Sequence, residues 1–441
     1  SILRYRVRVL HSFGSHNLKT AQQKKFWGKM PVAQRIGNEN YALTNWLVIF
    51  FLCFVLANIL DNYKTYGIIR SPLQLTTDLY EFLIIWWWLF ALFYLVIVLQ
   101  IVISAVLEKC LLSRLMSENK GALLHTVNTF LLYNVFACIC FYQKLNGIFA
   151  FALAPHLFFP TMKLLSYQLN NRRIRIQNEQ TAELKSDQNT KIEHFKIGSL
   201  RHLFRYMFCS GCLVYKFHTW KKGKSDYKAS LTFILRSVAM LLACSLIMHQ
   251  YVMTELQNAS YYIDKRQHLN LLSTFLKLAL PIHIVWSAFF YFYLYNACFK
   301  LPSILFGTEK ITYIQDWWNS ANIGAYWATW NYPTHLFFKE EVFIPALEMG
   351  LSKHQAACVV GVVSGVIHEY LWTIPFRIGY GGALLIMMAQ IPFSTLSKYI
   401  SNRFGNQWGN VLVWMQLIIG HTLYAILIHY FTQYLPNKST I

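Results

Sequence analysis

Nine long apolar runs, separated by polar segments, dominate the hydropathy pattern of the chain. Most of them approach or exceed the roughly 20 residues that an α-helix needs to cross a bilayer. The pattern therefore predicts an all-α polytopic membrane protein with about nine transmembrane helices. The runs are residues 43–61, 82–107, 122–142, 146–167, 231–254, 272–299, 354–375, 380–398 and 409–432.

The composition agrees with a membrane protein. Of the 441 residues, 55% are hydrophobic and only 13% are charged, and the mean hydropathy is +0.33. This balance excludes an ordinary water-soluble domain. Aromatic residues make up 17% of the chain, which is typical of wide contact with membrane–water interfaces.

The net charge of +21 would suggest nucleic-acid binding in a soluble protein, but here the basic residues are concentrated in residues 1–40 and 168–230. A cytosolic N-terminus and nine helices collect most of this charge in the cytosol, as the positive-inside rule requires. We therefore expect a lumenal C-terminus and no nucleic-acid partner. The cytosolic loops are then 107–121, 168–230, 300–353 and 399–408, and the opposite loops are 62–80, 143–145, 255–271 and 376–379.

The chain is divided into a basic cytosolic N-terminal segment, residues 1–42, and a membrane domain, residues 43–441. Ser1–Asn40 contains no apolar core of a signal peptide, so the first spanning helix is expected to act as the insertion signal. Asn258 and Asn437 begin glycosylation sequons that this topology places outside the cytosol.

Cys209 and Cys212 form an isolated CxxC pair, with His202 and His218 nearby in the sequence. A zinc site is conceivable, but no second pair follows at zinc-finger spacing. Ordinary thiols are favoured, and no metal is predicted.

Tryptophans are concentrated in the loop that follows the sixth run, at Trp317, Trp318, Trp327 and Trp330. Indole rings are most stable at the headgroup level of a membrane. The loop is expected to lie at that level or to be partly re-entrant, and a membrane-surface helix without chemistry is the alternative.

The seventh run places ionisable groups in an apolar helix. At helical spacing Gly361, Ser364, Gly365, His368 and Trp372 share one face, and the glycines alone could mean only close helix packing. Burying His368 and the adjacent glutamate is costly, and such groups within a membrane indicate a functional site.

Two familiar chemistries do not fit the spacing. His368-Glu369 does not begin an HExxH zinc motif because residue 372 is Trp, and Ser364 does not lie in a GxSxG elbow. Imidazole can remove a proton from an alcohol near neutral pH, and an apolar site suits lipid substrates.

An ordered set of motifs resembles the membrane-bound O-acyltransferases, within them the branch of the diacylglycerol and sterol O-acyltransferases. The motifs are Asp316-Trp317-Trp318-Asn319, Trp330-Asn331, His368-Glu369-Tyr370 and Met387-Met388-Ala389-Gln390-Ile391-Pro392. Flanking pieces extend the likeness from about residue 41 onward, at Asn45-Trp46, Tyr66-Gly67-Ile68, Leu276–Pro281, Gly409-Asn410 and Leu417–Gly420.

The resemblance implies an MBOAT-like fold with a buried reaction chamber. It makes His368 the catalytic base, Asn331 its partner and Gln390 a polar group lining the chamber. The remaining residues implied to contact substrate are Asp316, Trp317, Trp318 and Asn319 for acyl-CoA, Trp330, Glu369 and His335 near the site, and His421, where the diacylglycerol branch usually has Gln.

The resemblance also implies acyl-CoA as co-substrate, no cofactor, and diacylglycerol as the acceptor that becomes triacylglycerol. It implies a homodimer in the endoplasmic reticulum membrane. The chain departs from the family at Thr312-Tyr313-Ile314, where an aromatic is missing or displaced, and at Ser210-Gly211-Cys212, which replaces Ala-Pro-Thr.

Three alternatives stay open. The acceptor could be a sterol or a long-chain alcohol, or the chain could be an inactive structural membrane subunit with the same fold. A transporter is disfavoured because we find no inverted repeat or paired broken helices. Retention of Asn331, His368 and Gln390 favours an enzyme.

Overall fold

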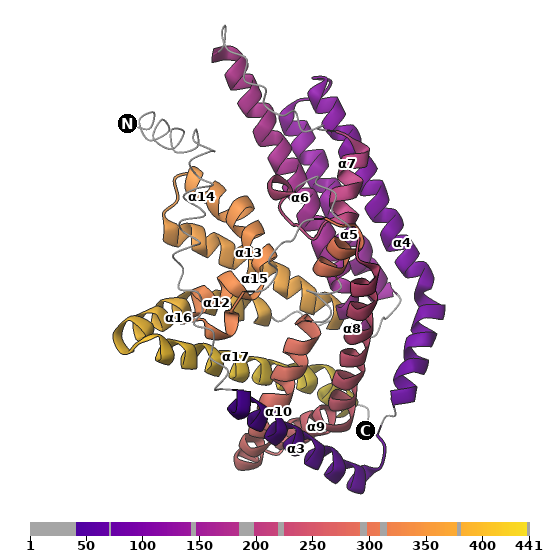
Figure 1. Ribbon diagram of the computed structural model, residues 1–441, viewed down its shortest axis with the longest axis vertical. Coiled ribbons are helices and arrows are strands. Elements are labelled where there is room, and N and C mark those ends of the chain that lie inside the picture. The colour runs from indigo at the N-terminus through magenta and orange to yellow at the C-terminus, as the bar shows by residue number, and fades with distance from the viewer. Residues whose placement is uncertain are drawn as a thin grey trace. The chain divides into compact units, whose positions relative to one another are not determined.

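The computed structural model describes residues 41–69, 72–142, 147–184, 198–218, 225–291, 298–308, 315–376 and 381–438. Within these ranges all regular secondary structure is helical (Figure 1). The expectations for residues 1–40, and the departure at Thr312-Tyr313-Ile314, lie outside the described residues. Helix α3 (Tyr41–Tyr66) belongs to a first compact unit that ends at Thr65, and the other elements belong to a second unit, Tyr66–Ile441.

Seven helices of the described part are long and apolar enough to cross a membrane. They confirm the prediction of an all-α polytopic membrane protein and coincide with seven of the nine predicted runs. The other two runs, 43–61 and 146–167, fall in α3 and in α6 (Gly147–Leu184), so the count of nine is not confirmed. The seven helices are Trp87–Leu112, Glu118–Ile139, Tyr227–Asp264, His268–Phe289, Lys353–Phe376, Gly382–Phe404 and Asn406–Tyr434.

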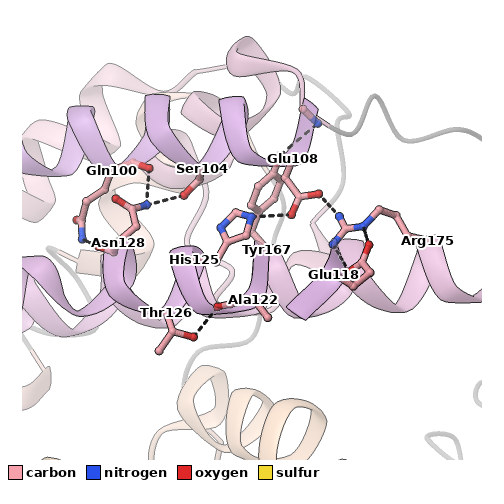
Figure 2. A network of polar contacts seen from close by, with 11 residues as sticks. Gln100, Ser104, Glu108, Glu118, Ala122, His125, Thr126, Asn128, Tyr167 and Arg175 are labelled. Carbon is pink, nitrogen blue, oxygen red and sulfur yellow. Dashed lines mark hydrogen bonds and ion pairs between the residues drawn. The ribbon is translucent and has the colours of Figure 1, made fainter. Parts of the chain in front are cut away.

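A buried ion-pair network joins α4 (Pro72–Leu112), α5 (Glu118–Tyr142) and α6 (Figure 2). The Glu108 carboxylate, fully buried, accepts a hydrogen bond from the Arg175 guanidinium of α6 and lies 3.2 Å from His125 Nε2 of α5. Arg175 Nε also donates to Glu118 Oε1 at 2.7 Å. The Arg175 guanidinium thus pairs with two carboxylates. This pairing offsets the cost of burying the Glu108 charge.

Amide contacts continue the same helix pair away from the charges (Figure 2). Asn128 Nδ2 of α5 donates to the Gln100 carbonyl at 3.0 Å and to Ser104 Oγ at 2.9 Å. The apolar core beside it includes Leu89, Ile101 and Phe136. Polar and apolar contacts therefore hold α4 against α5 along its length.

The segment between α6 and α8 (Tyr227–Ile247) is organised by one lysine. Lys163 is buried, and its Nζ donates to the carbonyls of Tyr206, Met207 and Ser210. These carbonyls close the π-helix η2 (Arg205–Cys209), which follows the short helix α7 (Leu200–Phe204). The Lys163 ammonium therefore supplies the hydrogen bonds that the free carbonyl groups at the end of η2 would otherwise make with water.

The central membrane helices pack around α10 (His268–Phe289), which contacts α8, α9 (Met253–Asp264) and α17 (Asn406–His429). A π-helical turn, η4 (Met248–Val252), connects α8 to α9 without a break. The apolar contact between α9, α10 and α17 includes Leu256, Leu278 and Ile426.

The segment 300–353, predicted as a cytosolic loop, consists largely of short helices in its described part. Their order is α11 (Leu301–Leu305), η6 (Trp317–Asn319), α12 (Ile323–Trp330), α13 (Tyr332–Phe338), η7 (Lys339–Phe343) and α14 (Ile344–Glu348). The chain ends, in its described part, with η8 (Tyr430–Tyr434) and α18 (Leu435–Lys438).

Helices α15 (Lys353–Phe376) and α16 (Gly382–Phe404) pack together more extensively than any other described pair (Figure 1). A Cβ on Gly365 would lie 2.6 Å from Leu384 Cδ1, and one on Gly361 would lie 2.9 Å from Ile391 Cδ1. The glycines therefore serve close packing, as small residues often do between membrane helices.

Helix α17 lies against the tryptophan-rich segment just as closely. A Cβ on Gly409 would come within 1.9 Å of the Ala321 carbonyl oxygen. Asn410 Nδ2 donates to the Trp318 carbonyl at 2.8 Å and to the Ser320 carbonyl at 3.0 Å. The segment is thus anchored to the last membrane helix.

We predict that Arg175→Met destabilises the protein by about 3–5 kcal/mol, because the buried Glu108 carboxylate loses its charge partner. Thermal unfolding in detergent measures this, with Arg201→Met as the control, since Arg201 is exposed and makes no ion pair among the described residues. Adding Glu108→Gln should recover part of the loss. An unchanged unfolding temperature for Arg175→Met would contradict the prediction.

We also predict that Gly409→Ala lowers the free energy of unfolding by at least about 1–3 kcal/mol, because its methyl group meets a backbone oxygen that no rotamer change can move. Gly420→Ala on the same helix is the control, since nothing lies within 4 Å of its Cβ position. That variant should stay within about 1 kcal/mol of wild type. Equal effects of the two substitutions on thermal unfolding would be evidence against the described contact.

Candidate active site

His368 lies in the middle of α15 and is half-buried. Its Nδ1 is 2.7 Å from the Ser364 carbonyl oxygen and 3.4 Å from Ser364 Oγ. A carbonyl can only accept, so in the neutral ring the proton is assigned to Nδ1 and the lone pair to Nε2. Among the described residues Nε2 makes no hydrogen bond, so the ring is oriented by Nδ1 and its Nε2 lone pair has no protein partner.

Glu369 is directed into the connection between α15 and α16. Its carboxylate accepts from the backbone N–H groups of Gly381 at 2.9 Å, Ala383 at 2.9 Å and Leu384 at 3.1 Å, and from Thr373 Oγ1 at 3.1 Å. A carboxylate at a helix N-terminus satisfies free N–H groups and interacts favourably with the helix dipole. The predicted substrate contact of Glu369 stays a prediction, and the contacts seen here make it a helix cap.

Gln390, on α16, is oriented by two neighbouring side chains. Its Oε1 accepts from Trp327 Nε1 at 3.4 Å and from Gln416 Nε2 on α17. The indole nitrogen can only donate, which fixes which end of the amide faces it. The Gln390 Nε2 group makes one long contact, 3.4 Å to the Ile386 carbonyl, and retains a hydrogen for a substrate oxygen.

Asn331 occupies the joint between α12 and α13. Its Oδ1 accepts from the Thr334 N–H at 3.3 Å and so caps α13. The side-chain Nδ2 makes no hydrogen bond among the described residues. As in Gln390, the side-chain oxygen of Asn331 is hydrogen-bonded to the protein, and its NH₂ group remains as a donor.

The tryptophans of this segment form an aromatic cluster with α17. The Trp317 ring lies 5.1 Å from Trp330 and 5.7 Å from Trp414, between ring centroids. Trp330 is buried and stacks on Tyr326 at 5.7 Å. Such ring pairs stabilise beyond their buried area, so the cluster fixes the position of Asn331, which follows Trp330 directly.

The acyl-CoA stretch predicted at Asp316–Asn319 forms the turn η6. Asp316, Trp318 and Asn319 are exposed, whereas Trp317 points into the aromatic cluster. Three of these four residues are thus accessible to a ligand, and one anchors the turn.

His335 lies on α13, with its ring 6.4 Å from that of Tyr332. Burial, and then the charge of Lys339, lower the pKa of His335 below its ordinary value. Its imidazole is therefore neutral at pH 7 and can act as a hydrogen-bonding group.

His421, on α17, contacts a second histidine. His421 Nδ1 lies 3.0 Å from Nδ1 of His283 on α10. The Trp286 ring lies 5.3 Å from His421 and stacks at 5.9 Å on Trp372 of α15. Helices α10, α15 and α17 thus meet around these aromatic rings.

The structure therefore brings the predicted residues into three neighbouring groups rather than one cluster. One is His368 with Ser364, one is Gln390 with the tryptophan-rich segment, and one is His421 with its aromatic neighbours. Sequence reasoning missed His283 and Gln416. Both are polar residues in apolar runs, and that signal could have marked them.

A cavity of about 310 Å³ opens beside η2, lined by Ser199, Arg201, His202 and Arg205. Burial, and then the charges of Lys163 and Arg205, lower the pKa of nearby His218 to about 4. This region is therefore strongly positive, but no predicted site residue lines the cavity. The predicted reaction chamber around His368 stays a prediction.

Within the described ranges, no group of three or more His, Cys, Asp or Glu side chains is placed to hold a metal ion. Cys212 of the CxxC pair donates its thiol to the Val214 carbonyl at 3.1 Å.

Comparison with known proteins identifies relatives that align with most of the chain. The chain is 27% identical over 418 residues to diacylglycerol O-acyltransferase 1 of Bos taurus, covering 91% of this chain and 83% of the relative. It is 26% identical over 414 residues to the Homo sapiens protein of that name, covering 91% and 82%. The Arabidopsis thaliana protein of that name is 27% identical over 331 residues, 73% of this chain and 60% of the relative.

The family model of the membrane-bound O-acyltransferases matches residues 41–429. The match includes every motif on which the resemblance was based. Because this match covers most of the chain and the fold consists of membrane helices, the chain belongs to the membrane-bound O-acyltransferase family.

Proposed function

We propose that this acyltransferase moves the acyl group of acyl-CoA to the hydroxyl of diacylglycerol, forming triacylglycerol within the membrane. The observation that carries the proposal is the hydrogen bond between His368 Nδ1 and the Ser364 carbonyl. It leaves the Nε2 lone pair available to take the hydroxyl proton. The names of the relatives support diacylglycerol as the acceptor.

In the proposed reaction the acceptor oxygen attacks the thioester carbonyl as Nε2 of His368 removes its proton. The new C–O bond forms, the C–S bond breaks, and the proton passes from the imidazolium to the departing CoA sulfur. An apolar surrounding limits hydrolysis of the thioester by water. The histidine is regenerated in each turnover, so no cofactor is consumed.

The side-chain amides of Gln390 and Asn331 are assigned to different substrate atoms. Gly361 of α15 contacts Ile391 of α16, so Gln390 lies near the level of Gly361. His368 is seven residues further along α15, about 10 Å at 1.5 Å per residue. We therefore assign the Gln390 NH₂ group to an ester carbonyl of the acceptor. Asn331 is the candidate donor to the developing oxyanion.

Acyl-CoA is proposed to contact the exposed residues of η6, with its phosphates attracted to the basic cytosolic segments. The proposed topology has a basic cytosolic N-terminal segment, residues 1–42, and a lumenal C-terminus. We further propose a homodimer in the endoplasmic reticulum membrane.

We predict that His368→Ala lowers the turnover of acyl transfer by about 10²- to 10⁴-fold, the usual contribution of a general base. Membrane insertion should be retained, because the substitution adds no buried charge. Turnover is measured with labelled oleoyl-CoA and diacylglycerol in vesicles. His354→Ala is the matched control, since His354 is an exposed residue at the start of the same helix. Retention of more than about a tenth of wild-type turnover by His368→Ala would remove the base assignment.

We predict that triacylglycerol is the main product when diacylglycerol, cholesterol and a long-chain alcohol are supplied in parallel with oleoyl-CoA. Acceptor choice depends on pocket contacts rather than on the base, so the wild-type protein can be tested directly. Products are separated and counted by the label. If steryl ester or wax ester dominates and triacylglycerol stays at background, the acceptor assignment is wrong and the acyltransferase assignment stands.

A further inference from the structure

Two histidines from helices far apart in the sequence form a hydrogen-bonded pair. Nδ1 of His283 and Nδ1 of His421 are 3.0 Å apart, and the two rings are stacked at 19° with centroids 5.2 Å apart. A hydrogen bond between two imidazole nitrogens needs a proton on one and a lone pair on the other. The two neutral rings must therefore adopt opposite tautomers.

His283 is enclosed by protein. It is 6% exposed, its Nε2 lies 3.4 Å from Ser287 Oγ, and its ring lies 5.5 Å from that of Trp414. Both of its nitrogens are thus next to protein partners. His421 is less buried, and among the described residues its Nε2 makes no hydrogen bond. Only His421 has a nitrogen to offer to a ligand.

The pair is connected to the helix of the proposed base. Trp286 lies 5.3 Å from His421 and stacks at 17° on Trp372, one turn beyond His368 on α15. The Trp372 ring also meets Tyr424 of α17 edge-on at 4.9 Å. The Trp286 and Trp372 rings thus link His421 to α15 at a point one turn from His368.

Two proton arrangements satisfy the pair. If His421 donates, its Nε2 carries a lone pair, and His283 Nε2–H donates to Ser287. If His283 donates, His283 Nε2 accepts from the Ser287 hydroxyl, and His421 carries its proton on Nε2. Apart from its hydroxyl, diacylglycerol offers ester oxygens, which only accept. The second arrangement alone makes His421 a donor to such an oxygen.

We propose that His283 is a positioning residue that holds His421 in the Nε2–H tautomer, and that His421 Nε2 donates to an ester carbonyl of the acceptor. This inference rests on the proposed function. An imidazole presents a donor at Nε2 only when a partner holds the proton away from Nδ1. His283 is that partner.

The test is a double-mutant cycle on the full-length protein in vesicles, with His283→Phe and His421→Gln alone and together. We expect His283→Phe to raise KM for diacylglycerol about 5- to 10-fold, as expected for loss of one hydrogen bond, with KM for oleoyl-CoA unchanged. In the His421→Gln background, whatever its own activity, His283→Phe should change KM for diacylglycerol less than twofold. Such non-additivity measures the coupling of the two residues.

Two further variants separate positioning from a merely structural role. His283→Asn keeps an N–H donor near the place of Nδ1 and should restore KM for diacylglycerol to within about twofold of wild type, since a single hydrogen bond accounts for the loss. His268→Phe, on an exposed histidine at the start of α10, should leave both KM values unchanged. If His283→Phe fails to fold, the Asn variant still tests the inference.

The inference is overturned if the effect of His283→Phe is the same in both backgrounds. It is also overturned if kcat and both KM values change together with the unfolding temperature, or if His283→Asn behaves as His283→Phe does. Absence of triacylglycerol synthesis by the wild-type protein would overturn the proposed function together with this inference. Synthesis with additive effects would overturn this inference alone.

Discussion

The constraint on which this structure depends is that polar groups buried away from water must find partners in the protein. Glu108 is compensated by Arg175, the Lys163 ammonium by backbone carbonyls, and the Glu369 carboxylate by three N–H groups and one hydroxyl. The contacts of Glu108 and Lys163 join segments distant in the sequence, and the N–H contacts of Glu369 join α15 to α16. The polar residues therefore fix which helices are neighbours, and the apolar surfaces then pack along them.

The candidate site follows the same constraint in a different way. His368, Gln390 and Asn331 each have one polar atom held by the protein and a second atom left for a ligand. The held atom orients the side chain and, for Gln390 and His368, decides whether the free atom donates or accepts. Such preorganisation is useful for catalysis, because the groups need not reorient when charge develops on the substrate.

Hydropathy predicted the membrane helices well, since seven candidate spans coincide with predicted runs. The length and apolar composition of a helix are local properties of the sequence, so they can be read without knowing the fold. The order of the motifs predicted the family, because motif order is also visible in the sequence alone. The direction of Glu369 could not be predicted, because adjacent helix residues point about 100° apart and the dipeptide does not show which one faces the site. The His283–His421 pair depends on a contact between residues 138 positions apart, and the turn η6 is held by hydrogen bonds from α17. No local pattern contains that information.

The cap formed by Glu369 affects how mutational surveys of this protein should be interpreted. Glu369 adjoins His368, and its carboxylate fixes the first turn of α16, the helix that carries Gln390. Under the proposed function, a substitution at Glu369 would displace Gln390, the residue assigned to the acceptor, without changing the proposed base. Under that proposal, a deep mutational scan scored by lipid synthesis would report losses at both members of the dipeptide. A separate readout of folded protein abundance would distinguish the loss of the proposed base from the loss of a helix cap.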